Sequence, residues 1–257
     1  MGVACAPRTE KRADEKTPRE IAGEYLLKDY DPVSIFNVPV TLVDRAKYGV
    51  IDMHSHDYND ADPEKIADRD GRNISLMIDI ARELDAAVVG SVIVERDKEY
   101  RNRMYLITPD ADVLWYDKHH LFSIGGEAER YTAGSERKVV HWRGIDYLLE
   151  ICYDLRFPVW SRCRGDYDAI IYSALWPKPR REVWKALLRA RAIENQAYVI
   201  GVNRTGTEPG LEYSGDSAII DYRGCTMVDM ASSEGVEIVE IDSEALVAFR
   251  AKFNVAR

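Results

Sequence analysis

The sequence predicts an α/β protein with mixed β-sheets. Short apolar runs that end in polar or turn residues alternate with segments whose apolar residues recur at helical spacing. Gly- and Asp-rich turns separate the two kinds of segment, and the sequence contains no internal repeat. At 257 residues and 46% hydrophobic, the chain is long enough to bury a sizeable core. Alternation of this kind is typical of strands covered by helices.

Composition and charge exclude several classes of protein. A formal net charge of −9 argues against a nucleic-acid partner or an anionic membrane surface. No stretch approaches the ~18 apolar residues of a membrane span, and the N-terminus lacks the apolar region of a signal peptide. The four cysteines show neither CxxC spacing nor a zinc pattern. We therefore expect a soluble cytoplasmic protein.

The N-terminal quarter differs from the rest of the chain. Residues 1–24 are charged and resemble a flexible leader, residues 38–43 predict a strand, and residues 48–57 form an apolar run that ends in His54 and His56. On a strand these two side chains would share a face, the spacing needed to bind one metal ion. The run resembles the first barrel strand of the metal-dependent amidohydrolases. A metal site would need further ligands, and no later histidine has the context of a barrel strand.

From residue 70 the elements follow in a regular order. Residues 74–85 and 182–196 carry apolar residues at helical spacing and predict two amphipathic helices. Apolar runs bounded by turns predict strands over residues 86–94, 100–108, 113–116, 147–151, 166–175, 197–203, 217–221 and 235–241. We expect the inward-facing apolar runs to pack two sheets against each other.

The strand over residues 147–151 leads directly to Cys152. A thiol at the exit of a buried strand is held rigidly, and the backbone N–H groups that follow it can point at a developing oxyanion. A free cysteine can equally be a small buried hydrophobe. The surrounding motifs decide between the two interpretations.

Four separated motifs resemble the nitrilase superfamily of carbon–nitrogen hydrolases, and within it the ω-amidase-like branch. They are YDKHHLF at 116–122 with the loop at 125–134, CYDLRFP at 152–158, LWP at 175–177 and ARAIENQAY at 190–198. The resemblance covers about residues 70–253 and implies a four-layer αββα sandwich, an amidase activity and no cofactor. It implies that Cys152 is the nucleophile, that Lys118 supplies positive charge beside it, and that Glu127 positions the lysine.

The same resemblance and elementary chemistry indicate how a substrate could be held. Tyr153 follows the nucleophile, and its backbone N–H would help to bind the oxyanion. Arg156 suits a substrate carboxylate through paired hydrogen bonds, and Trp176 could line the pocket. For both side chains, core packing or a structural ion pair is an equally good interpretation.

The sequence departs from the family's pattern at its N-terminal side. The family's general base is a glutamate in a PE motif, which is not found here, and Asp52 is the nearest stand-in. The first βα unit looks replaced or missing. We therefore expect an atypical and possibly foreign segment at residues 1–67, followed by a carbon–nitrogen hydrolase domain at residues 68–257.

Three functions stay open at this point. The first is thiol-dependent hydrolysis of a small carboxylate-bearing amide by a homo-oligomeric ω-amidase-like enzyme, with Asp52 as base. The second is a catalytically impaired member of the same fold that acts as a binding protein. The third is a metal-dependent hydrolase that uses His54 and His56.

Overall fold

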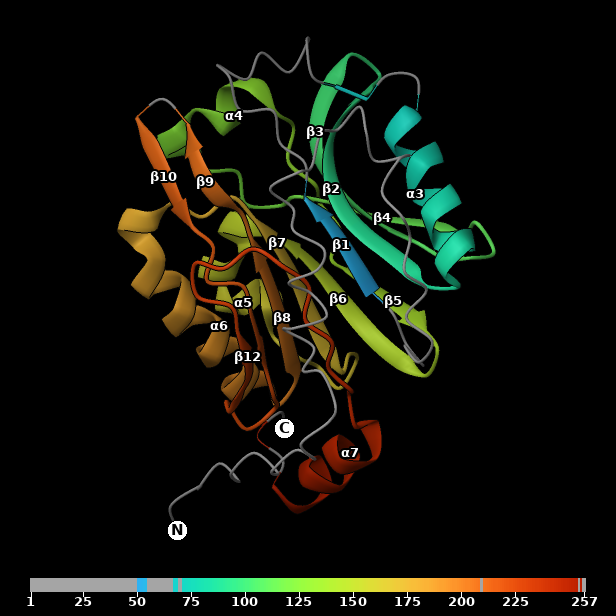
Figure 1. Cartoon of the computed structure of the whole chain (residues 1–257), viewed down its shortest axis with the longest axis vertical. Helices are drawn as coiled ribbons and strands as arrows, with labels where there is room; N and C mark the ends of the chain where they lie inside the picture. Colours follow the sequence, from blue (N-terminus) through green and yellow to red (C-terminus); the bar gives the residue numbers. More distant parts are fainter. Residues whose placement is uncertain (1–49, 55–66, 69–70, 209, 254, 256–257) are drawn as a thin grey trace, which may run out of the picture.

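The computed structural model describes residues 67–68, 71–208, 210–253 and 255, together with the backbone of residues 50–54. Two β-sheets lie face to face in it, with helices on the outside (Figure 1). Among the described residues, no helix is long and apolar enough to cross a membrane.

The smaller of the two main sheets has the strand order β1-β2-β3-β4. β1 (Val50–His54) runs parallel to β2, and the other neighbours are antiparallel. The remaining strands are β2 (Ala87–Arg96), β3 (Glu99–Ile107) and β4 (Val113–Asp117). Helix α3 (Arg72–Leu84) covers the outer face of this sheet, where it buries Met77 and Ala81.

The larger sheet has the strand order β12-β11-β8-β7-β6-β5. Its strands are β5 (Lys138–Trp142), β6 (Ile145–Ile151), β7 (Ala169–Ala174), β8 (Tyr198–Asn203), β11 (Ala218–Ile220) and β12 (Thr226–Asp229). The central strands β6, β7 and β8 are parallel. Helix α6 (Arg181–Asn195) and the short α5 (Pro158–Ser161) cover its outer face.

The remaining elements lie around the sandwich. They are η3 (Ser123–Gly125), α4 (Glu127–Arg130), η4 (Cys152–Arg156), η5 (Lys178–Arg180), the hairpin of β9 (Thr205–Glu208) and β10 (Leu211–Ser214), and α7 (Ser243–Lys252). In Figure 1 the β9–β10 hairpin lies at the end of the molecule opposite α7.

Three buried clusters define the layers. The largest joins inner-face residues of both sheets, including Val89 and Leu106 from one sheet and Leu149 and Ile171 from the other. A second cluster packs the large sheet against α6, and a third packs the small sheet against α3. Each sheet is thus apolar on both faces, because one face meets the other sheet and one meets a helix. The predicted four-layer αββα sandwich is confirmed.

One predicted strand is wrong. Residues 235–241 are apolar apart from Glu237 and Glu240, yet they form no strand in the structure. Val236 and Ile238 are about half exposed, at 56% and 48%. The apolar run therefore does not mark a buried strand in this segment. The strand expected at residues 38–43 lies outside the described residues.

The end of β1 lies near the end of β6, although the two strands belong to different sheets. His54 is the backbone partner of Ser91, and the Ser91 hydroxyl lies 3.0 Å from that of Ser173 in the opposite sheet. Ser173 is in turn the partner of Ile151, the last residue of β6. The C-terminal ends of β1 and β6 therefore meet at one end of the sandwich.

Candidate active site

Cys152 lies on a strained turn at the end of β6. Its backbone φ is 46°, in the left-handed region that non-glycine residues rarely adopt. The turn aims the thiol toward the end of β7, where Sγ lies 3.9 Å from the carbonyl oxygen of Leu175. Burial raises the pKa of the thiol, and the nearby charge of Lys118 opposes that rise. The resting thiol is therefore protonated and needs a base before it can attack.

Lys118 follows β4 and points at a carboxylate. Its ammonium group donates hydrogen bonds to both oxygens of Glu127, at 2.7 and 2.6 Å, and its side chain is only 1% exposed. Burial alone would lower the pKa of Lys118, but the charges of Glu127 and Cys152 outweigh it and raise this pKa. Glu127 also accepts the backbone N–H of Phe122 at 2.7 Å. Glu127 therefore fixes the ammonium group of Lys118, whose positive charge acts on the thiol of Cys152.

Gly134 explains why the loop after Glu127 can pass close to the lysine. A Cβ atom at position 134 would lie 2.2 Å from the carbonyl oxygen of Asp117, so only glycine fits there. The backbone N–H of Gly134 donates to the carbonyl of Lys118 at 2.9 Å. The 131–134 segment therefore fixes the backbone that carries the lysine.

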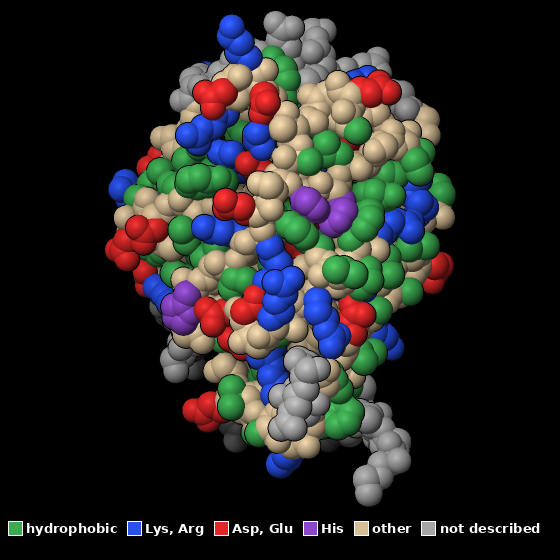
Figure 2. Space-filling model, turned by 180° about the vertical axis from the view of Figure 1, so that it is seen from behind, with side chains coloured by type: hydrophobic (Ala, Val, Ile, Leu, Met, Phe, Trp, Pro, Cys, Tyr) green, Lys and Arg blue, Asp and Glu red, His purple; other side chains and the backbone are tan. Residues whose placement is uncertain are grey.

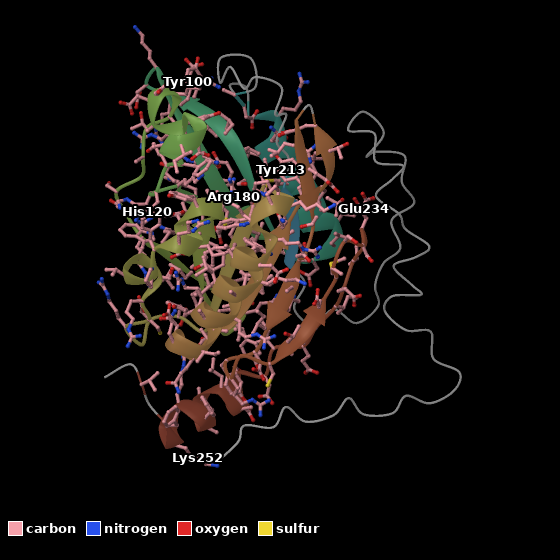
Figure 3. All side chains as sticks on the ribbon, turned by 90° about the vertical axis from the view of Figure 1, so that its left-hand side faces the viewer. Tyr100, His120, Arg180, Tyr213, Glu234 and Lys252 are labelled. Atoms are coloured by element: carbon pink, nitrogen blue, oxygen red, sulfur yellow. The ribbon has the colours of Figure 1, made fainter. Side chains whose placement is uncertain are left out.

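An aromatic and cationic rim lies next to Cys152. The guanidinium carbon of Arg156 lies 5.1 Å from the ring centroid of Trp176 and 6.0 Å from that of Tyr153. Among the described residues, the guanidinium of Arg156 has these ring contacts and no carboxylate partner. Arg180 stacks 5.3 Å from the ring of Phe122, and η5, which carries it, contacts β10 (Figure 3). The rim thus presents an unpaired positive charge to solvent.

The N-terminal candidates are placed by their backbone alone. Asp52 is opposite Val89, an inner-face residue, and His54 is at the C-terminal end of β1, the end that meets β6. His56 lies outside the described residues. Among the described residues, no group of three or more potential ligands could hold a metal ion.

A buried polar network behind Cys152 was not predicted from the sequence. Asp154 is fully buried and accepts hydrogen bonds from Tyr116 and His120. His120 stacks on Phe157 at 3.6 Å, and His119 stacks on Trp160 at 3.8 Å. Figure 2 shows two adjacent histidines at the surface, bordered by hydrophobic side chains. The motifs at 116–122 and 152–158 contain these residues. The spacing of polar residues along the sequence does not reveal that the carboxylate of Asp154 joins the two motifs.

Glu150 is a second buried carboxyl group of this region. Its Oε2 accepts the Ser161 hydroxyl at 2.8 Å, while its Oε1 has no hydrogen-bond partner. Burial, with a smaller contribution from the charge of Asp154, raises the pKa of Glu150 to about 8. At neutral pH the side chain is therefore mainly a neutral acid.

Replacing Glu150 with glutamine should change how stability depends on pH. From about pH 4.5 to about pH 8 the unfolded chain ionises Glu150 while the folded protein keeps its proton, so the folded wild type loses stability as pH rises. Glutamine stays neutral in both states. We expect Glu150→Gln to gain roughly 1 kcal/mol per pH unit over the wild type across this window. Urea unfolding at pH 5, 6, 7 and 8 measures the difference, and parallel curves would contradict the assignment.

Comparison with known proteins agrees with the geometry. The model of the carbon–nitrogen hydrolase family matches residues 45–251, a range that includes both the 48–57 segment and the site. The chain is 47% identical over 171 residues to the omega-amidase YafV of Yersinia enterocolitica, covering 66% of this chain and 67% of that protein. It is 36% identical over 203 residues to a 2-oxoglutaramate amidase of Bacillus subtilis, covering 77% and 78%.

A solved structure shows the same arrangement of elements. XC1258 from Xanthomonas campestris, described as a CN-hydrolase superfamily protein with an arsenic adduct in its active site, superposes with a TM-score of 0.78. The two chains are 39% identical, and the alignment covers 82% of this chain and 84% of that one.

Proposed function

The chain belongs to the carbon–nitrogen hydrolase family, and on that premise we propose that it hydrolyses the ω-amide of a small carboxylic acid through a thioester on Cys152. The observation that carries the proposal is the buried Lys118–Glu127 pair, in which Glu127 holds the ammonium group of Lys118 and the positive charge of Lys118 acts on a thiol in a strained turn. The similarity to relatives named omega-amidase and 2-oxoglutaramate amidase supports the substrate class.

The first half of the reaction releases ammonia. The base takes the proton of Cys152, and Sγ attacks the amide carbonyl carbon to give a tetrahedral oxyanion. Lys118 and the backbone N–H of Tyr153 stabilise the negative charge on that oxygen. The proton passes to the amide nitrogen, the C–N bond breaks, and ammonia leaves a thioester behind.

The second half regenerates the thiol. The base takes a proton from water, the resulting hydroxide adds to the thioester carbonyl, and the C–S bond breaks with return of a proton to Sγ. The product is a dicarboxylic acid. Glu127 takes no proton in either half, because it is already held by Lys118 and by the backbone N–H of Phe122.

Asp52 is our candidate for the base. The C-terminal end of its strand, β1, lies beside the end of β6. The backbone of Asp52 pairs with that of Val89, an inner-face residue of β2. Aspartate is one methylene shorter than the family's glutamate, so its carboxylate reaches less far toward the thiol. We therefore expect a lower rate of amide hydrolysis. This assignment implies a working but slow enzyme.

Arg156 is our candidate for binding the substrate carboxylate. Its guanidinium lies beside the nucleophile's turn, stacks on Trp176 and Tyr153, and has no carboxylate partner among the described residues. A planar guanidinium binds a carboxylate through two parallel hydrogen bonds. Trp176 itself is fixed, because its N–H groups donate to Asn203 and to the carbonyl of Arg180.

The assignment of Arg156 predicts different rates of hydrolysis for an amide with a carboxylate and an amide without one. We expect ammonia release from succinamic acid to exceed that from butyramide, which lacks the carboxylate. Arg156→Gln should raise KM for succinamic acid by about 10-fold or more, the worth of one charge-assisted hydrogen bond, and leave butyramide unchanged. Arg164→Gln, at an exposed position on the loop after Cys163, is the matched control. Equal effects of Arg156→Gln on both amides would contradict the assignment.

The same assay decides the two other functions. Absence of ammonia from every ω-amide, with binding retained, would favour the catalytically impaired protein. Activity that is lost with a chelator and restored by a metal ion would favour the hydrolase that uses His54 and His56. We expect activity to survive chelation and to be lost with a thiol reagent. The homo-oligomer and the cytoplasmic location stay predictions, which sedimentation and cell fractionation can test.

A further inference from the structure

One carboxylate connects the two halves of the site. Asp154 is fully buried, and its two oxygens accept four hydrogen bonds. Oδ1 accepts from the backbone N–H of His120 at 2.9 Å and lies 2.8 Å from the His120 ring nitrogen Nδ1. Oδ2 accepts from the Tyr116 hydroxyl at 2.9 Å and from the backbone N–H of Ile151 at 3.1 Å.

The partners of Asp154 flank the reacting groups on both sides. Tyr116 comes two residues before Lys118, and His120 comes two residues after it. Ile151 directly precedes Cys152, whose backbone is in the strained left-handed region. The hydroxyl of Tyr116 also accepts the indole N–H of Trp160, at 3.1 Å. A single side chain therefore holds the lysine segment from both ends and the nucleophile's turn from one.

We infer that Asp154 is a positioning residue that fixes the backbone of Lys118 relative to that of Cys152, and so sets the lysine–thiol geometry on which catalysis depends. The inference rests on the proposed function, because it assigns Cys152 and Lys118 their roles. Misplacement of a reacting group by about 1 Å can cost about 10²-fold in rate.

Position and charge have opposite consequences here, which makes the inference testable. The negative charge of Asp154 by itself raises the pKa of the Cys152 thiol, whereas Lys118 lowers it. If Asp154 acted by charge alone, its neutralisation would lower the thiol pKa. If it acts by holding Lys118 in place, the thiol loses its cation and its pKa rises.

Asp154→Asn is the informative variant. Each carboxylate oxygen accepts one backbone N–H, from His120 or from Ile151. An amide NH₂ in place of either oxygen would face a donor, so asparagine breaks one side of the link in both orientations. We expect kcat to fall about 100-fold and KM to change by less than about 3-fold, because the substrate contacts stay in place.

Alkylation of the thiol gives a readout that does not depend on amidase activity. Among the described residues, the charges that act on the pKa of Cys152 are those of Lys118, Glu127 and Asp154. We expect the pH profile of Cys152 alkylation by iodoacetamide to shift upward by about one pH unit in Asp154→Asn, and peptide mass spectrometry assigns the label. A downward shift would show that charge alone acts and would overturn the inference.

Two further variants separate positioning from simple stability. Tyr116→Phe keeps the carboxylate and removes one of its hydrogen bonds, so we expect kcat to fall about 10-fold. Because both residues act through the same link, kcat of the double variant Tyr116→Phe/Asp154→Asn should fall by less than the product of the two single effects. Tyr167→Phe removes a buried hydrogen bond to the carbonyl of Ser161 and serves as control. It should lower the melting temperature and leave kcat and the alkylation profile unchanged.

The outcomes are distinct. A lower melting temperature of Asp154→Asn with unchanged kcat and an unchanged alkylation profile would overturn the inference and leave a structural role only. Amidase activity that survives Cys152→Ala would instead overturn the proposed function. An upward alkylation shift without amidase activity in the wild type would support the positioning role and count against the function.

Discussion

Replacing Cys152 with alanine should reduce ammonia release from succinamic acid by about 10⁴-fold or more, to the background of the buffer. Removing a nucleophile abolishes the covalent route entirely, and the remaining binding groups supply only a small part of the rate. The fold should be unaffected, because Cys152 is only partly buried, its one hydrogen bond, to the carbonyl of Leu175, is weak, and alanine keeps its Cβ atom against the core. Stopped assays of the purified variants measure ammonia release, and circular dichroism measures whether the fold is retained.

Replacement of Cys163 is the control for the loss of a thiol outside the site. Cys163 is buried at 3% exposure among the residues under α6, and its Sγ contacts the carbonyl of Tyr167. Cys163→Ala should cost stability without changing kcat. Equal loss of activity in both variants would mean that the assay reports folding rather than the nucleophile.

Replacing Asp52 with asparagine should lower kcat by about 10²–10⁴-fold, the usual contribution of a general base. Asparagine keeps the size of the side chain and cannot accept the thiol proton. Asp52→Glu should act in the opposite direction and raise kcat, because one more methylene restores the family's reach to the thiol. Unchanged rates in both variants would show that Asp52 is not the base.

The pH profile separates a lost base from a displaced strand. With Asp52 as base, the acid limb of kcat against pH should disappear in Asp52→Asn. Asp52→Ser gives a matched small polar side chain, and it should resemble asparagine. The thermal transitions of the three variants should agree with the wild type, since the pairing of β1 with β2 uses the backbone.

The sandwich could be predicted because each of its main strands and helices has a recognisable local pattern of apolar residues. The helices at Arg72–Leu84 and Arg181–Asn195 each show one apolar face, and each ends with a residue in the left-handed conformation. The central strands are continuous apolar runs, since both of their faces are covered. The strand predicted at residues 235–241 is wrong because the apolar residues Val236 and Ile238 are about half exposed and the segment pairs with no described strand.

The site could be predicted only in part. The cysteine, lysine and glutamate stand in motifs whose order along the chain is informative, and the structure joins Lys118 and Glu127 directly. The role of Asp154 depends on contacts between residues 34 and 38 positions apart, which periodicity cannot reveal. The neutral state of Glu150 likewise depends on burial against α6, where no sequence pattern marks a carboxyl group that keeps its proton.

Detection of an acyl-enzyme shows directly whether Cys152 is the nucleophile. Wild-type protein mixed with succinamic acid, quenched in acid within the first turnovers and digested, should yield the peptide that contains Cys152 with the mass of a succinyl thioester. Hydroxylamine should remove that mass, and Cys152→Ala should never acquire it. Ammonia release at the full rate with an unmodified Cys152 peptide, or with the acyl group on another residue, would contradict a thiol mechanism at Cys152.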